Sequence, residues 1–293
     1  MKNRRAGARR LLSLAAIFTF AVALAAATLT TRTSAAEKVN AEDLLTKHLN
    51  SIGSAEARAA ARSRIITGVA QFTFRLGGSG TATGNAVLAS EGQKSLLSMA
   101  FGAPDYPHDI MGFNGKDLKV RDIRPGVRSL LGEVLMRNSE LFREGIIGGT
   151  LSAAWPLANN GERSPKLESA GTDKIDGRDV YKFRYIPRKG SEFKITLFFD
   201  AENFRHVRTQ YDKSVPAPMG GIDSSARQRE TNIKMIEDFS DFRTEANLLL
   251  PHTYKIQYSA YGQNNGVTQE WVFKLSTFSF EPVDDKAFNL VAE

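Results

Sequence analysis

The residues that could do chemistry in this 293-residue chain are scattered, and they form no known catalytic motif. The sequence contains neither a paired-histidine zinc motif nor a nucleophile elbow, a phosphate-binding loop or any cysteine. Its four histidines are far apart, at His48, His108, His206 and His252. We therefore expect structural or surface roles for the histidines, and neither a metal nor another cofactor.

Acidic residues form two candidate clusters. Asp173 and Asp176-Gly177 resemble part of a calcium loop, but the later ligands are missing, so a hairpin turn is the favoured interpretation. Glu237, Asp238 and Asp241 lie together on a predicted strand. Spaced carboxylates can act as an acid and a base, but a solvated strand face is commoner. Because no nucleophile and base can be paired, we predict no catalytic residue and no enzyme, and a hydrolase is the weakest alternative.

The charge of the chain is unevenly distributed. The formal net charge is +7, from 39 basic and 32 acidic residues. The first 36 residues hold six of the basic residues and no acid, so the remaining 257 residues are close to neutral, at +1. This balance argues against nucleic acid as a partner.

The basic N-terminus has the three parts of an export signal. Arg4 to Arg10 form a positive region, Leu11 to Ala27 are apolar and uncharged, and Ser34-Ala35-Ala36 supplies small residues for cleavage. We predict a signal peptide over residues 1–36, cut near Ala36, and a periplasmic mature protein. A membrane anchor is the alternative, but the apolar stretch is at the lower limit for spanning a bilayer. Without cysteine, the N-terminus cannot be acylated as in a bacterial lipoprotein.

The elements that must position any site are mainly strands. Alternation such as that of Tyr181, Phe183 and Tyr185 with Lys182 and Arg184 recurs along the chain. About eleven strands are expected, with helices at 42–49, 55–64 and 127–143. The predicted fold class is α+β and mainly antiparallel β, a curled half-barrel with helices covering its concave apolar face. Residues 37–293 should form one domain, and 212–227 a long Pro-, Gly- and Ser-rich loop.

The apolar side chains are the remaining candidates for function. A curled sheet whose inner face is apolar either packs as a solid core or leaves a ligand cavity. Composition alone favours the solid core. The residues that would line a cavity are Phe72, Phe74, Leu97, Met99, Phe101, Leu131, Val134, Leu135, Trp155, Phe183, Leu197 and Phe199.

Several loose motifs of the chain resemble the LolA/LolB-like family of periplasmic lipoprotein carriers. They are Ile175 to Arg178 before a strand, Phe198-Phe199-Asp200, Phe239 to Phe242 before Leu250-Pro251, and Asp285 to Phe288. The resemblance covers roughly residues 41–288 and concerns order and pattern rather than an invariant signature. It implies a half-barrel with a helical lid over an apolar cavity.

The resemblance also implies a function. The protein would be a non-enzymatic carrier or binder of acyl chains, from a lipid or an acylated lipoprotein, that serves the outer membrane or envelope. The absence of cysteine agrees with the soluble carriers of the family. A further envelope protein could be its partner, and we expect a monomer. The alternative is a structural or sensing envelope protein with a filled core and no lipid ligand.

Overall fold

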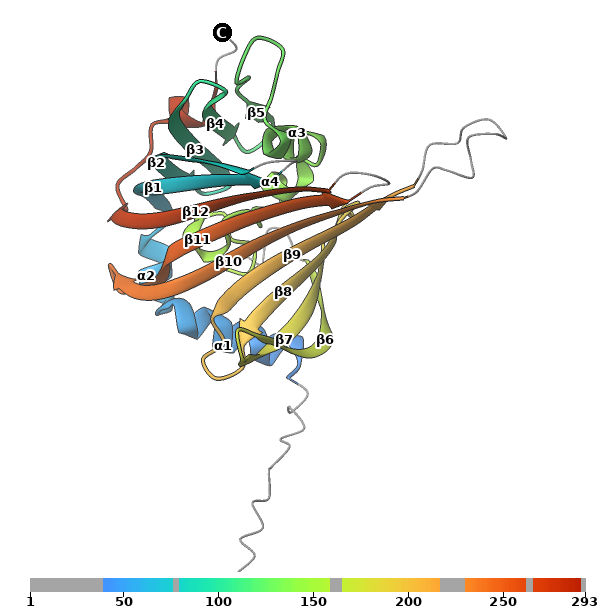
Figure 1. The fold of residues 1–293 in the computed structure, drawn as a ribbon. Coiled ribbons are helices and arrows are strands. Elements are labelled where there is room, and N and C mark those ends of the chain that lie inside the picture. The colour runs from blue at the N-terminus through green and yellow to red at the C-terminus, as the bar shows by residue number, and fades with distance from the viewer. Residues whose placement is uncertain (1–38, 76–78, 159–164, 217–229, 262–265, 291–293) are drawn as a thin grey trace, which may run out of the picture. The chain divides into compact units, whose positions relative to one another are not determined.

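The computed structural model describes residues 39–75, 79–158, 165–216, 230–261 and 266–290. Within them, twelve strands form one antiparallel sheet in the order β5-β4-β3-β2-β1-β12-β11-β10-β9-β8-β7-β6. Its two edges, β5 and β6, do not pair with each other, so the sheet is open. Figure 1 shows the long strands β9 to β12 curving across the molecule. The predicted fold class is confirmed, with twelve strands in place of about eleven.

The sheet consists of two meanders joined by their first and last strands. The first meander is β1 (Ser63–Arg75), β2 (Ser79–Glu91), β3 (Lys94–Ala103), β4 (Tyr106–Phe113) and β5 (Leu118–Val120). The second is β6 (Lys166–Ile175), β7 (Arg178–Ile186), β8 (Lys194–Asp200), β9 (His206–Val215), β10 (Thr231–Glu245), β11 (Leu248–Tyr261) and β12 (Gly266–Ser279). β1 pairs with β12, where Phe72 lies opposite Trp271. This pairing makes one sheet of both halves.

Tight turns set the register of the hairpins. Between β6 and β7, Asp176 and Gly177 have φ of 50° and 80°, and Ile175 pairs with Arg178. A two-residue turn with both φ angles positive matches the twist of the flanking strands. The interpretation of Asp176-Gly177 as a hairpin turn is confirmed.

Helix α1 (Ala41–Ile52) shows how strongly the sheet curls. It is capped by the side chain of Asn40, which accepts from the Asp43 amide, and it buries Leu44, His48 and Ile52. The helix contacts both β11 and β6, which four other strands separate in the sheet. A single helix can touch both only if the sheet curves around it. α2 (Ala55–Ala60) follows.

The connection from β5 to β6 carries the other covering elements. They are α3 (Leu130–Arg137), α4 (Glu140–Arg143) and the short 3-10 helix η1 (Gly149–Leu151), and η1 contacts β9 and β11. The single helix predicted over 127–143 is wrong, because it breaks at Asn138. There the side-chain amide donates to the Val134 carbonyl at 2.7 Å, and such local bonding makes asparagine a poor helix former.

Other predicted boundaries also change. The helix predicted over 55–64 ends at Ala60, since β1 already begins at Ser63. The loop predicted over 212–227 starts later, because β9 runs to Val215, and the rest of it beyond residue 216 lies outside the described residues. The predicted signal peptide and its cleavage site also lie outside them. A 3-10 helix, η3 (Asp285–Phe288), is the last element among the described residues, and its Phe288 is buried. In the part of the chain that is described, no helix has the length and hydropathy needed to cross a membrane.

Candidate functional site

The predicted cavity residues gather in one apolar interior. Ten of the twelve are buried: Phe72, Leu97, Met99, Phe101, Leu131, Leu135, Trp155, Phe183, Leu197 and Phe199. All ten belong to one continuous hydrophobic core. Val134 is half-buried and packs against this core. Phe74 lies near the end of β1, 39% exposed, where it stacks on Phe72.

The interior is filled by its own side chains. Near the β1–β12 junction, Phe72 packs on Tyr106 and Trp271 with ring centroids 4.4 and 5.2 Å apart. Beneath α4 and η1, the space lined by Leu88, Leu97, Phe142 and Leu151 has a volume of only 30 Å³. That is room for about one water molecule, so an acyl chain enters only if covering side chains move.

A larger apolar opening lies beside α3, and we call it the mouth. Leu130 and Val134 of α3 face Val215 at the end of β9, Pro216 just after it and Ile233 of β10 across a pocket of 550 Å³. Leu130 is 46% exposed and Val215 37%. The volume falls in the range of small-molecule sites. Leu135, which directly follows Val134 in α3, is buried in the core. The helix therefore contributes residues to both the mouth and the core.

Charged and polar side chains close the mouth at its rim. The Lys213 ammonium on β9 donates to the Glu192 carboxylate. It also donates to the Asn138 side-chain oxygen, at 3.1 Å, where α3 ends. The rim thus ties the C-terminal end of α3 to the sheet by side chains rather than by strand pairing.

A buried carboxylate holds the other end of α3. The Ser129 hydroxyl accepts from the Gly132 amide at 2.8 Å, as an N-cap, and donates to Asp109 Oδ2 at 2.6 Å. The Tyr106 hydroxyl also donates to Oδ2, at 2.8 Å, whereas Oδ1 is buried without a partner. Burial raises the pKa of Asp109 to about 6, and the bonds from Ser129 and Tyr106 oppose the rise. We call Asp109, Ser129 and Tyr106 the latch.

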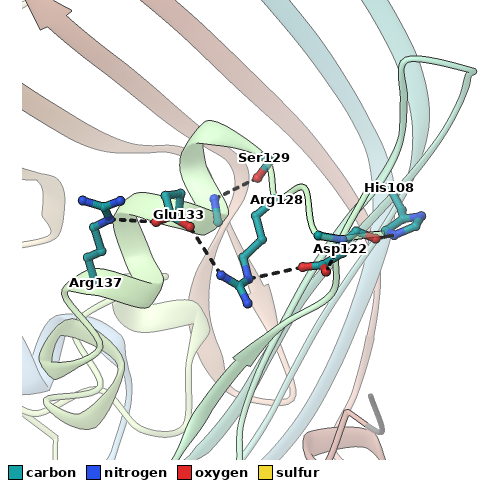
Figure 2. A network of polar contacts seen from close by, with 8 residues as sticks. His108, Asp122, Arg128, Ser129, Glu133 and Arg137 are labelled. Carbon is teal, nitrogen blue, oxygen red and sulfur yellow. Dashed lines mark hydrogen bonds and ion pairs between the residues drawn. The ribbon is translucent and has the colours of Figure 1, made fainter. Parts of the chain in front are cut away.

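Ion pairs on the outer side of α3 reinforce its position. Figure 2 shows Arg128 between Asp122 and Glu133, and Glu133 also bound to Arg137. The Arg128 guanidinium lies 3.3 Å from the Asp122 carboxylate and 3.5 Å from that of Glu133. The Arg137 guanidinium lies 2.7 Å from the Glu133 carboxylate. His108 Nε2 lies 3.0 Å from the Asp122 carbonyl. Solvent screens exposed pairs of this kind, so each contributes little to stability and mainly orients the helix.

A second buried carboxylate lies under the segment before η1. Glu237 is completely buried and accepts from the hydroxyls of Tyr211 and Tyr254 and from the Gly148 amide, the last at 2.8 Å. Burial raises its pKa, against the effect of these three bonds. The prediction that Glu237 belongs to a solvated face is wrong, although Asp238 does pair with Arg208 and Lys255 at the partly exposed side.

Three histidines are structural. His48 and His206 are fully buried, and burial lowers both pKa values, that of His48 to about 4, so both rings are neutral. His48 Nδ1 donates to the Phe204 carbonyl at 3.1 Å, and Nε2 accepts from the Trp155 indole at 3.0 Å. His252 is buried with Nδ1 3.1 Å from the Leu275 carbonyl. Among the described residues, no three acidic or histidine side chains are placed to hold a metal ion.

Asp109 is the buried acid that sequence reasoning missed, and Glu237 was considered only as part of a solvated strand face. A signal was present, because each shares the strand alternation of buried apolar neighbours. Asp109 is in phase with Met111 and Phe113, and Glu237 with Met235 and Phe239. A carboxylate at an inward strand position is therefore the pattern that would have found them.

The chain therefore belongs, by its fold, to the class of open, curled antiparallel sheets whose apolar concave face is covered by short helices. Solved structures that match include a LolA superfamily protein from Nitrosomonas europaea, at 14% identity and a TM-score of 0.45, covering 85% of this chain and 97% of that one. Another is a DUF1329 family protein from Desulfovibrio piger, at 12% identity and a TM-score of 0.43, covering 84% and 96%. The first of these structures carries the name of the family that the sequence resembles. No family model matches the chain, and no curated protein does.

Proposed function

We propose that the chain is a non-enzymatic binder or carrier of acyl chains, from a lipid or an acylated lipoprotein, in the periplasm of a cell envelope. The observation that carries the proposal is the mouth beside α3. Leu130, Val134, Val215 and Ile233 form a partly exposed apolar part of its lining, and Val134 and Ile233 pack against the core. The rest of the lining is polar or charged: Glu133, Arg137, Asn138, Glu192, Lys213 and Ser214. Exposed apolar side chains that converge on one pocket are typical of a binding site.

Uptake would proceed by movement of α3. Side-chain contacts at Ser129, Glu133 and Asn138 hold this helix, and its Leu131 and Leu135 fill the interior. An acyl chain that replaces these side chains gains about 0.8 kcal/mol for each buried methylene group. Ten such groups supply about 8 kcal/mol, from which the displacement of α3 is subtracted. Release reverses the exchange, and no bond is made or broken.

A second candidate is a structural or sensing envelope protein with no lipid ligand. The observation that favours it is the filled interior, with only 30 Å³ between the sheet and the elements over Leu97 and Phe142. In that case α3 would stay in place, and an envelope protein would be the partner of the exposed apolar residues around the mouth.

The test compares two exposed apolar residues. Val69 on β1 is 47% exposed and points away from the core, between the inward-facing Gly68 and Ala70 positions, and so matches the 46% exposed Leu130. We expect Leu130→Glu to weaken binding of a fluorescent fatty acid about tenfold, because it loses an apolar contact and places a charge in the mouth. Val69→Glu should leave the affinity unchanged.

Native mass spectrometry of the wild-type protein, purified after export, supplies an independent readout. A co-purified lipid that is lost in Leu130→Glu and retained in Val69→Glu supports the carrier. Absence of both a co-purified lipid and fatty-acid binding would refute it and leave the filled-core candidate.

A further inference from the structure

A second pocket, away from the mouth, is lined by three arginines. It lies between α2, the first residues of β1 and the segment around Thr150 to Ala158, and its volume is 180 Å³. Arg58 comes from α2, Arg62 from the turn after it, and Arg64 from β1. The other lining residues are alanines and Ile52, Thr150, Ser152 and Trp155. Among the described residues, the lining contains three arginines and no acid, so this part of the pocket is cationic.

Arg64 is a buried cation without a counter-charge. Arg64 is only 6% exposed, and its guanidinium donates to the Ala61 and Thr150 carbonyls. In the described part of the chain, no carboxylate lies within ion-pair distance of it. Burial lowers its pKa to about 10, which still leaves it charged at neutral pH. Because burying an unpaired charge is costly, this arrangement favours an anion beside Arg64.

An unpaired hydroxyl adds an independent observation. Thr150 lines the same pocket, is 3% exposed, and its Oγ1 is buried with no hydrogen-bond partner among the residues that the structure describes. Buried polar atoms normally have a partner, and an orphan one indicates a group that completes it. A hydroxyl can donate to an anion as the guanidinium groups do.

The other two arginines differ in their hydrogen bonds and exposure. Arg58 donates to the carbonyls of Leu49 and Gly53, where α1 ends. Arg62 is exposed. Glu56, on the same helix as Arg58, is an exposed acid whose pKa is lowered by hydrogen bonds from its own backbone and from Ser54 and, less, by Arg58, but it does not line the pocket. Arg62 is therefore the side chain best placed to be recruited by a ligand.

We propose that this pocket binds a phosphate-type oxyanion through Arg62, Arg64 and Thr150. Guanidinium groups match the geometry of phosphate oxygens with paired, charge-assisted hydrogen bonds. The phosphate can come from the solvent as the free ion or from a phospholipid headgroup, and the apolar alanines beside Trp155 accommodate either. The site is separate from the mouth and does not depend on the proposed acyl-chain binding.

The experiment is a calorimetric titration in phosphate-free buffer. Inorganic phosphate, a short-chain phosphatidylglycerol below its micelle concentration and a diacylglycerol of the same chain length are each added to the full exported protein. We expect Arg62→Gln to weaken phosphate-dependent binding about tenfold, the effect of losing one charge-assisted hydrogen bond. Arg75→Gln, at the exposed far end of β1, is the matched control and should bind as the wild type does.

The outcomes distinguish free phosphate from a phospholipid headgroup, and both from a purely structural role of the arginines. Binding of inorganic phosphate that depends on Arg62 supports a free-phosphate site. Binding of phosphatidylglycerol alone, with the same dependence and none by diacylglycerol, supports a headgroup site. Arg64→Lys keeps the charge but loses the planar fork, so it should also weaken the titrated binding. No phosphate-dependent binding by the wild type, or equal losses in Arg62→Gln and Arg75→Gln, would overturn the proposal and leave the arginines as caps of backbone carbonyls.

Discussion

The latch at the start of α3 predicts a specific dependence of stability on pH. Asp109 is fully buried, and its pKa is raised from an ordinary 3.8 to about 6. For an acid with a raised folded-state pKa, the native state binds the proton more tightly than the unfolded state between these two values. The contribution to stability is thus fully present below pH 3.8 and is lost as the pH rises through about 6.

The magnitude follows from the two pKa values. The difference between 3.8 and about 6 corresponds to about 3 kcal/mol over the whole titration. By the linkage relation, the part of this contribution to the free energy of unfolding that is lost between pH 5 and pH 8 is about 1.4 kcal/mol. Asp109→Asn has a similar shape but no proton to titrate. Its stability relative to the wild type should therefore improve by about 1.4 kcal/mol from pH 5 to pH 8.

Urea unfolding of both proteins at pH 5, 6, 7 and 8 measures this difference. Other titratable groups are present in both proteins and cancel in the comparison. Asp105→Asn, at an exposed turn before β4, is the control and should follow the wild type at every pH. A difference between the wild type and Asp109→Asn that stays constant with pH, or that changes in the opposite sense, would refute the account of the latch.

Two further predictions concern the packing of the covering elements. Gly132→Ala should lower the free energy of unfolding by about 1 kcal/mol, because its Cβ would lie 2.7 Å from Val120 Cγ1 and 2.9 Å from the Ser129 hydroxyl, a clash larger than the gain in helix propensity. Gly102→Ala, where a Cβ meets nothing within 4 Å, should change the thermal midpoint little, and equal midpoints for both variants would contradict this reasoning. Glu237→Leu should cost about 3 kcal/mol or more in urea unfolding, because it leaves the hydroxyls of Tyr211 and Tyr254 and the Gly148 amide without an acceptor. Glu237→Gln keeps an acceptor and should cost less; a smaller loss in Glu237→Leu would disprove the role of the carboxylate.

Local patterns in the sequence were sufficient for the strands and the hairpins. The alternation at Tyr181 to Tyr185 predicts a strand, and the structure places it in β7. Asp176-Gly177 is a two-residue turn because both residues tolerate positive φ. Boundaries were less predictable: high helix propensity at Ala55 to Arg64 predicts ten helical residues, but pairing of Ser63 and Arg64 with β2 ends the helix early.

The candidate site was predicted in part. Most of the apolar residues proposed to line the interior do meet there, since strand alternation assigns them to one face. Alternation does not say whether that face surrounds a cavity, and here Tyr106 of β4 and Trp271 of the neighbouring β12 fill the space around Phe72. An acid such as Asp109 was missed although it alternates with buried apolar residues, because residue type alone predicts an exposed carboxylate, and its bonds to Tyr106 and Ser129 form only in the folded chain.

By itself, the sequence determined the class of secondary structure, the turns, the uneven charge and the absence of thiol chemistry, since each depends on residue type and on neighbours a few positions away. The tertiary structure alone decided which groups meet. It brings Arg64 to Thr150, 86 positions later in the chain, and Phe72 opposite Trp271. Burial, unpaired charge and free volume are properties of such distant contacts. The filled interior, the mouth beside α3 and the arginine pocket therefore follow only from the way the sheet curls around its helices.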